Sequence, residues 1–296
     1  MELRVLRYFL VVAREENITK AAEQLHITQP TLSRQLSQLQ EELGVELFKR
    51  VQHGIALTGD GMLLRRRALE IVALSDKAER ELTHAEDVLA GEIAIGSGET
   101  KSIQALTSMM AEFRQEHPDV TFDMYTAIAD DVKERLDRGL LDIGLLVEPV
   151  DISQYFFLRL PGKERAGVLV RADSPLAEKD VVRPKDLAGT PLLMVKRPYL
   201  RNEMANWFGE SIDQMEIAGT YNLIYNAALM VKNHVGVALC IELESHFDDI
   251  CFRPLFPTRE TGNVLVWKKE QTLPAATGAF IDFVKACFKG ITYDLE

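Results

Sequence analysis

The chain has 296 residues, a length that allows about two domains with hydrophobic cores. Its residues are 47% hydrophobic and 27% charged, which is ordinary for a soluble globular protein. No apolar run approaches the roughly 18 residues of a membrane span, and the apolar stretch at residues 8–13 is too short for a signal peptide. We therefore expect a cytoplasmic protein without a membrane partner.

The net charge of −11 is unevenly distributed along the chain. Residues 1–67 carry ten Lys and Arg against eight Asp and Glu, whereas the remainder carries 24 basic and 37 acidic residues. The acidic excess lies outside the first segment, so it does not exclude nucleic acid as a partner there. Cys240, Cys251 and Cys287 are widely spaced and form no metal-binding pair, which indicates reduced thiols.

Three helices are predicted at the start of the chain. The first covers residues 2–15, where apolar residues recur at helical spacing. The second and third cover residues 19–25 and 28–39, separated by a tight connection. Thr19 and Thr28 are the expected N-caps of these two helices, because a hydroxyl there can accept from an unpaired amide one turn along.

The third predicted helix has an apolar side and a polar side. Leucines at helical steps form the apolar side, at Leu32, Leu36, Leu39 and Leu43. The polar side presents amides, hydroxyls and one guanidinium, on Gln29, Thr31, Ser33, Arg34, Gln35, Ser37 and Gln38. Pro30 fits the first turn, where its missing N–H leaves no bond unmade. This donor and acceptor set suits base edges and phosphates in the DNA major groove; a small helical hairpin with a polar surface is the alternative.

A short turn with adjacent cations is predicted over residues 49–54, and residues 55–57 predict a brief strand. Together they look like the wing of a winged helix-turn-helix. Lys49 and Arg50 are then candidate phosphate or minor-groove contacts. A solvated charged turn is the alternative for each of them.

A long helix is predicted from Thr58, capped by Thr58 or Asp60. Small or apolar residues alternate at steps of three and four, at Gly61, Leu64, Ala68, Ile71, Ser75, Ala78, Leu82, Ala85 and Leu89. Such a seam needs a partner helix. The simplest partner is the same helix of a second subunit in a homodimer; packing on the chain's own domain is the alternative.

Strands and helices alternate from residue 91 onwards, which indicates an α/β layer with a mainly parallel sheet. The predicted strands are 92–96, 120–125, 142–146, 166–170, 192–195, 217–221, 235–241 and 264–267. The predicted helices are 97–117, 130–139, 222–233 and 279–288. Two such units in tandem predict a cleft between them, with a ligand near strand C-terminal ends and helix N-termini.

Polar residues that follow predicted strands are the candidate ligand contacts, at Ser97, Glu99, Thr100, Thr126, Glu148, Tyr199 and Asn222. Ser97 and Thr100 stand at a predicted helix start, which is a natural seat for a carboxylate, although either hydroxyl could simply cap the helix. The two glutamates, if they point inward, favour a ligand with a cationic group. Lys196 and Arg197 favour an anion instead, and the sequence leaves the two alternatives open.

No catalytic residue, metal site or cofactor is predicted. Asp130 and Asp131 are adjacent, so on a helix they point in different directions and form no acid/base pair. The six histidines show no metal-ligand spacing, and no Gly-x-Ser-x-Gly elbow or Walker loop occurs. We therefore expect a protein that is not an enzyme.

The chain as far as Gly61 resembles the DNA-binding domain of LysR-type transcriptional regulators. The match runs in one register through Ala21-Ala22, Leu25, Thr28-Gln29-Pro30, Leu32-Ser33, Leu39, Leu43-Gly44, Leu47-Phe48, Arg50, Leu57-Thr58 and Gly61. It departs from the family at Glu16-Asn17, where Gly-Ser is usual, and at Gln40, where Glu is usual. The remainder resembles, by pattern, the effector-binding domain of the same family, which has the fold of periplasmic small-molecule binding proteins.

The resemblance implies an α/β protein with an N-terminal all-α winged helix-turn-helix, a long linker helix and two α/β subdomains similar to periplasmic binding proteins. The implied domains are 1–58 for DNA binding, 59–90 for the linker and 91–296 for effector binding, the last divided into 91–160 plus 268–296 and 161–267. The implied function is sequence-specific DNA binding controlled by a small-molecule effector of unknown identity.

The expected DNA contacts are Thr28, Gln29, Pro30, Thr31, Ser33, Arg34, Gln38, Lys49 and Arg50. Of these, Gln29, Ser33 and Arg34 are expected at or near bases. The expected partners are double-stranded DNA, the effector, a second copy in a homodimer or homotetramer, and RNA polymerase as a further candidate. The alternative is a small-molecule binding protein or enzyme whose N-terminal helices serve only oligomerisation.

Overall fold

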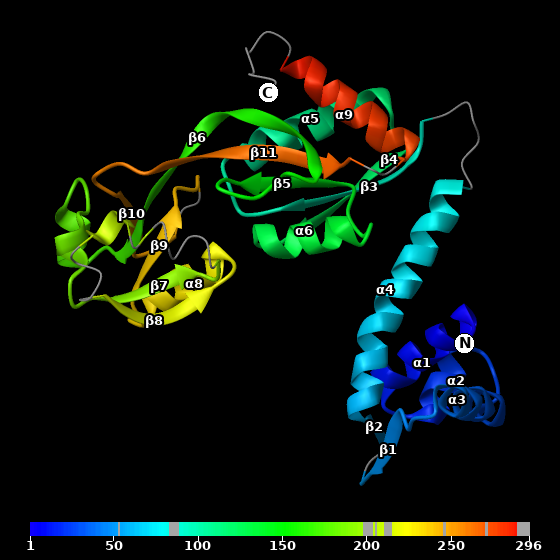
Figure 1. Cartoon of the computed structure of the whole chain (residues 1–296). Helices are drawn as coiled ribbons and strands as arrows, with labels where there is room; N and C mark the ends of the chain where they lie inside the picture. The colour runs from blue at the N-terminus through cyan, green and yellow to red at the C-terminus, as the bar shows by residue number, and fades with distance from the viewer. Residues whose placement is uncertain are drawn as a thin grey trace. The chain divides into compact units, whose positions relative to one another are not determined.

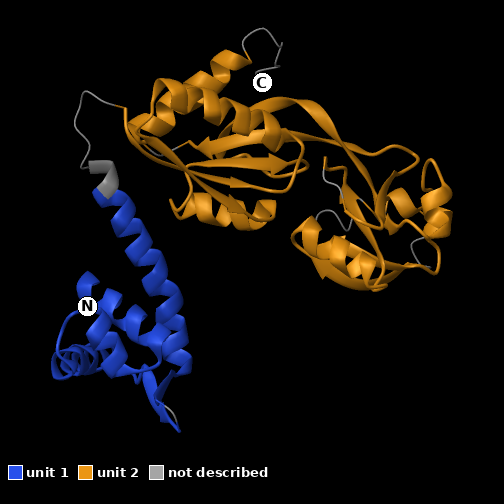
Figure 2. Ribbon diagram, turned by 180° about the vertical axis from the view of Figure 1, so that it is seen from behind, with its two compact units in different colours: residues 1–83 blue, residues 84–296 orange. Residues whose placement is uncertain are grey.

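A computed structural model of the chain describes residues 1–52, 54–82, 89–197, 204, 206–209, 215–244, 247–269 and 272–288. The chain forms two compact units, Met1–Thr83 and His84–Glu296, which Figure 2 shows in different colours. The first unit is helical with a small hairpin, and the second is mixed α/β (Figure 1).

The N-terminal unit packs its helices around one core. Its elements are α1 (Leu3–Glu15), α2 (Ile18–Gln24), α3 (Gln29–Leu43), β1 (Phe48–Val51), β2 (Gly54–Leu57) and α4 (Gly59–Leu82). Leu32, Leu36 and Leu39 of α3 are buried in this core, which confirms the predicted apolar side. Leu43 is an exception and is 39% exposed, because α3 ends there and Gly44 turns the chain away in a left-handed conformation.

The helix starts differ from the predicted caps. Asn17, not Thr19, caps α2: its side-chain oxygen accepts from the amides of Thr19 at 2.9 Å and Lys20 at 3.1 Å. Thr28 does hold the N-cap position of α3, but its hydroxyl lies 2.8 Å from that of Thr31 rather than on an amide. An Asn oxygen reaches both orphan amides of a first turn, which explains its preference there.

The wing is an antiparallel hairpin of β1 and β2. The prediction that Lys49 and Arg50 lie in its turn is wrong. Both belong to β1, paired with Ala56 and Ile55 of β2. The hairpin is therefore longer than predicted, and its cations lie along a strand edge.

Helix α4 starts close to the rest of its own unit. Thr58 caps it as predicted, since its hydroxyl accepts from the amide of Gly61 at 3.0 Å. Leu64 and Ala68 pack into the N-terminal core. Over these turns the predicted seam packs on the chain's own domain, which was the alternative to pairing with a second subunit. Leu89, the last seam position, packs against the core of the second unit instead. The seam position Ala85 lies outside the described residues.

The second unit is built on a sheet with the order β4-β3-β5-β11-β6-β9-β7-β8, and β10 pairs with β6. The strands are β3 (Gly91–Ser97), β4 (Val120–Thr126), β5 (Ile143–Val147), β6 (Tyr155–Arg171), β7 (Pro191–Val195), β8 (Glu216–Tyr221), β9 (Val237–Ile241), β10 (Ile250–Pro254) and β11 (Glu260–Lys268). The helical elements are α5 (Ser102–Glu116), α6 (Ala129–Asp137), α8 (Ile224–Lys232), α9 (Ala275–Cys287) and the short 3-10 turns η1 (Pro175–Glu178) and η2 (Pro184–Leu187).

The parallel pairing expected from the alternating pattern is confirmed in two groups of strands. In the first group β3 pairs in parallel with β4 and β5, and in the second β7 pairs in parallel with β8 and β9. Strands β6 and β11 run antiparallel to their neighbours, and β6 passes from the first group to the second (Figure 1). We call these two groups, with their helices, the first and second halves. The expected boundaries at 160/161 and 267/268 fall within β6 and β11.

Helices cover both faces of the first half. On one face α5 and α9 pack together, and the rings of Phe113 and Phe280 lie 5.2 Å apart. On the other face α6 contributes Val132 and Leu136 (Figure 1). In the second half α8 packs on the sheet through small and branched residues such as Ala227.

Candidate functional site

The polar side of α3 is open to solvent. Gln29, Thr31, Arg34 and Gln38 are exposed, and Ser33 is half-buried. No acidic residue occurs in α3 before Glu41 and Glu42, next to its end, so the exposed side over the first turns presents amides, hydroxyls and one guanidinium. That surface can donate and accept hydrogen bonds without repelling a phosphate backbone.

The side chain of Gln40 joins α3 to the wing. Its oxygen accepts from the amide of Leu47 at 2.7 Å and more distantly from that of Phe48 at 3.4 Å. Lys49 and Arg50 follow directly and are exposed. Gln40 was noted in the sequence only as a departure from a family pattern, and its role depends on a contact that no local pattern reveals.

A cavity of about 140 Å³ lies where the two halves of the second unit meet. The segment after β3, strand β5 and helix α6 line it from the first half, and β7, β8, β9 and α8 line it from the second, together with residues of β6. Its wall is almost entirely apolar, and includes Leu145, Leu146, Val147, Met194, Val195, Met204, Tyr221, Ile224, Leu239, Cys240, Ile241 and Leu255. An apolar cavity with few polar groups at strand ends is typical of a small-molecule site.

Two charged side chains, Glu99 and Arg197, line this cavity, and each also joins the two halves. The carboxylate of Glu99, from the first half, accepts from the amide of Ile224 at the start of α8. The guanidinium of Arg197, from the second half, donates to the carbonyl oxygens of Val147 at 3.3 Å and Pro149 at 2.9 Å.

Glu99 lines the cavity as expected, but the hydroxyls of Ser97 and Thr100 are engaged elsewhere. Helix α5 begins at Ser102, later than predicted. Ser97 is buried and its hydroxyl donates to the carbonyl of Gly98 at 2.7 Å. Thr100 is also buried, and its hydroxyl donates to the carboxylate of Glu164.

Three of the remaining expected contacts, Thr126, Glu148 and Asn222, do not line the cavity either. Thr126 and Asn222 are exposed. The carboxylate of Glu148 lies 3.3 Å from the guanidinium of Arg159. Tyr199 lies outside the described residues.

Sequence patterns did not single out the cavity's apolar wall. Cys240 and Tyr221 lie at or next to the ends of strands, and that position is the signal from which they could have been predicted as cavity residues. Burial raises the pKa of the Cys240 thiol to about 12, and it also raises that of Tyr221, whose hydroxyl donates to the carbonyl of Leu239 at 2.5 Å. Neither group is charged at neutral pH, so the cavity keeps its apolar character.

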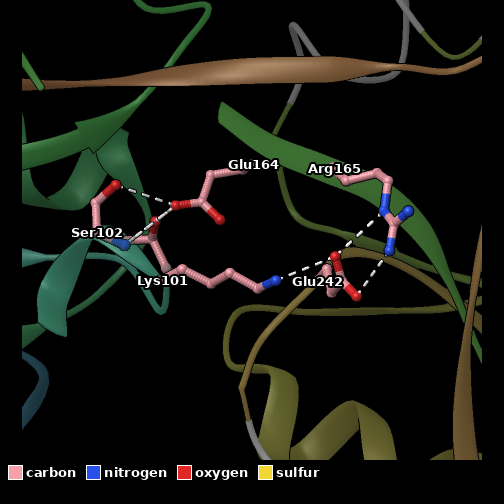
Figure 3. A network of polar contacts seen from close by, with 6 residues as sticks. Lys101, Ser102, Glu164, Arg165 and Glu242 are labelled. Atoms are coloured by element: carbon pink, nitrogen blue, oxygen red, sulfur yellow. Dashed lines mark hydrogen bonds and ion pairs between the residues drawn. The ribbon is translucent and has the colours of Figure 1, made fainter. Parts of the chain in front are cut away.

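A second polar contact between the halves involves Glu242, next to the end of β9 (Figure 3). Lys101 of the first half reaches its carboxylate at 3.1 Å, and Arg165 of β6 reaches it at 3.0 Å. Burial alone would raise the pKa of the Glu242 carboxyl. The hydrogen bonds from Arg165 and Lys101 outweigh burial and hold this pKa below its usual range.

Among the described residues, no helix is both long enough and apolar enough to cross a bilayer. Nor do three or more His, Cys, Asp or Glu side chains in that part of the chain gather as metal ligands.

Comparison with known proteins assigns both units. Residues 3–62 match the family model described as "Bacterial regulatory helix-turn-helix protein, lysR family", and residues 86–289 match the "LysR substrate binding domain". The Hca operon transcriptional activator HcaR of Escherichia coli (strain K12) is 30% identical over 305 residues, covering 99% of this chain and 100% of that protein. The HTH-type transcriptional regulator BsdA of Bacillus subtilis (strain 168) is 32% identical over 66% of this chain and 67% of its own length.

Solved structures share the same fold. CbnR, a LysR family transcriptional regulator, superposes with a TM-score of 0.75 at 21% identity, over 97% of this chain and 99% of that one. Full-length CbnR complexed with its target DNA gives a TM-score of 0.74 over the same shares. With both family models matched in order, the chain belongs to the LysR family of transcriptional regulators, in which a helix-turn-helix DNA-binding domain precedes an effector-binding domain.

Proposed function

We propose that α3 enters the major groove of duplex DNA and reads it through Gln29, Ser33 and Arg34. The observation that carries this proposal is the exposed side of α3, which has no acidic residue before Glu41. A guanidinium pairs with the guanine edge and an amide with the adenine edge, so these side chains have the chemistry for direct readout.

The neighbouring polar groups hold the phosphate backbone in this proposal. Thr31 and Gln38 flank the reading side of α3, and Lys49 and Arg50 extend it along β1. Thr28 and Pro30 stand at the exposed start of α3, where the backbone of the duplex passes a helix N-terminus. Such contacts orient the reading helix and carry no sequence information themselves.

We further propose that two or four copies assemble on DNA through α4. Outside the face that packs on α1, this helix exposes large apolar side chains, at Met62, Leu63, Leu69, Ile71 and Leu74. Exposed apolar side chains gathered on one helix favour a protein partner. A second copy would pair two reading helices on a two-fold related site.

The cavity of the second unit is the effector site in this proposal. A small molecule held there by both halves changes their arrangement, and that change alters how the assembled regulator acts on RNA polymerase. The ligand must bind two arrangements unequally, because equal binding shifts no equilibrium. In this proposal the protein has no catalytic activity and is located in the cytoplasm, where the DNA of a bacterium lies.

The test of the DNA-reading proposal is a footprint on the promoter region of the protein's own gene. Arg34→Ala removes the guanidinium and is expected to cost about 1–3 kcal/mol of specific binding, so the affinity for the protected site falls about five- to 150-fold. Arg14→Ala is the matched control, since Arg14 is also an exposed arginine but belongs to α1.

Both variants should keep the oligomeric state of the wild type, measured by light scattering. Protection that is unchanged in Arg34→Ala would remove Arg34 from the reading surface. Protection that weakens equally in both variants would mean that general positive charge, not the α3 surface, supports binding.

A further inference from the structure

The starts of two helices near the effector cavity are occupied by carboxylates of the chain itself. At the start of α5, one oxygen of Glu164 accepts from the amide and the hydroxyl of Ser102, each at 3.2 Å (Figure 3). The same oxygen accepts from the side-chain amide of Asn263 at 2.8 Å. Thr100 donates to the same oxygen. Glu164 comes from β6 and is only 1% exposed.

This arrangement fills the position where a bound anion would otherwise sit. A helix N-terminus carries the equivalent of roughly half a positive charge and attracts a carboxylate or phosphate. Here the amide, both hydroxyls and the Asn263 side chain are already committed to Glu164. The second oxygen of Glu164 is buried without a hydrogen-bond partner among the described residues.

The start of α8 is filled in the same way by Glu99. Its carboxylate bonds the amide of Ile224, and unlike Glu164 it also lines the cavity. An anionic ligand in that cavity would therefore meet a carboxylate of the wall, and the repulsion between like charges would weaken its binding. A ligand that donates a hydrogen bond or carries a positive charge would instead gain from Glu99.

Among the described residues that line the cavity, Arg197 is the one whose charge could favour an anion. Its guanidinium donates to the carbonyl oxygens of Val147 and Pro149, and so spans from the second half to the first. These bonds use the nitrogens Nη1 and Nη2 of the guanidinium and hold the halves together. A ligand carboxylate that paired with the same two nitrogens would compete with both carbonyl oxygens for them.

We propose that the effector is a compact apolar amine, whose nitrogen donates to Glu99, and not a carboxylate or a phosphate. This inference rests on the proposed function, in which the cavity holds the effector. The volume of about 140 Å³ is close to that of cavities known to hold a benzene ring. The apolar wall takes the body of the molecule, and Glu99 takes its polar end.

Three probes that share one ring and differ in charge test the proposal: benzylamine, benzyl alcohol and benzoate. Their binding to the full chain is measured by calorimetry at one pH and salt concentration. Benzylamine is expected to bind more tightly than benzoate by about tenfold or more, with the alcohol between them. Benzoate binding as tightly as benzylamine, or more tightly, would overturn the proposal and direct attention to Arg197.

Glu99→Gln is expected to abolish the preference for benzylamine, because it removes the charge and keeps the shape of the side chain. Glu148→Gln is the matched control, since Glu148 lies in the same unit but does not line the cavity. A preference that survives in Glu99→Gln would show that another group selects the amine, and would overturn the role given to Glu99.

A separate experiment tests whether Glu164 fills the anion-binding position at the start of α5. Glu164→Ala leaves the donors of Ser102 and Asn263 facing an empty space, so added acetate should raise its melting temperature and leave that of the wild type unchanged. Acetate raising both melting temperatures equally would show that the seat is open in the wild type. The comparison of probes on the wild type decides the proposal even if this variant does not fold.

The footprint on promoter DNA separates this inference from the proposed function. If the wild-type protein protects its promoter DNA but benzoate binds best, only the proposal of an amine effector is refuted. If the wild-type protein gives no specific protection, the proposed function as a regulator is refuted, whatever the probes show.

Discussion

Position 61 requires a glycine because of the atoms packed around it. A Cβ atom at this position would lie 2.1 Å from the carbonyl oxygen of Leu47, closer than atoms can approach. Gly59, two residues earlier, has nothing within 4 Å of the same atom. The absence of a side chain at Gly61 is therefore what allows α4 to start against the segment that leads into the wing.

Gly61→Ala should accordingly lower the stability of the N-terminal unit by about 1–3 kcal/mol, the cost of forcing extra atoms into a packed region. Gly59→Ala is the control and should be neutral or slightly stabilising, because alanine favours the helix. Thermal unfolding of the full chain, followed by circular dichroism, measures both. Equal effects of the two substitutions would contradict the close approach to Leu47.

At the scale of elements, the start of α2 depends on Asn17. Its side chain accepts from two amides of the first turn, whereas the exposed hydroxyl of Thr19 caps nothing. Asn17→Ala should destabilise the unit by about 1 kcal/mol, and Thr19→Ala should change it little. A denaturant titration of the two variants compares them, and a larger loss from Thr19→Ala would restore the cap that the sequence predicts.

The elements that sequence patterns predicted well are those whose signal is local. Leucines spaced for one face identified α3, and alternating strands and helices identified the two groups of parallel strands. Strand β6 was predicted only at residues 166–170, because its first part mixes exposed and buried positions irregularly. Strand β10 carries no fully buried residue, and the pattern does not predict it.

The effector cavity was harder to predict than the reading surface. The polar side of α3 is exposed because its own helix places it there, so one short stretch contains the whole signal. The contact between Glu164 and Asn263 joins residues 99 positions apart, and no local pattern contains it. The apolar wall of the cavity looks in sequence like any buried core, since Met194 and Leu239 would suit either role.

At the scale of the whole molecule, Glu242 joins the two halves of the second unit through Lys101 and Arg165. Because the pKa of its carboxyl is lowered in the folded protein, its contribution to stability is present above the unfolded pKa of about 4.3. That contribution is lost as the pH falls through the folded value.

Glu242→Gln should therefore lower the melting temperature at pH 7 and leave a smaller further loss on acidification below about pH 4 than the wild type shows. Melting curves across pH compare the two proteins. Parallel curves, with the same loss on acidification, would show that Glu242 contributes nothing through its charge.

The regulatory function requires that the N-terminal unit binds duplex DNA, and the salt dependence of that binding tests it most directly. Fluorescence anisotropy of a labelled promoter duplex, titrated with the full chain at several salt concentrations, reports it. We predict a binding constant that falls linearly on logarithmic axes, with a slope of about −0.9 for each phosphate contact. A chain whose N-terminal helices serve only assembly would show no affinity for the duplex at any salt concentration, and that result would contradict the account.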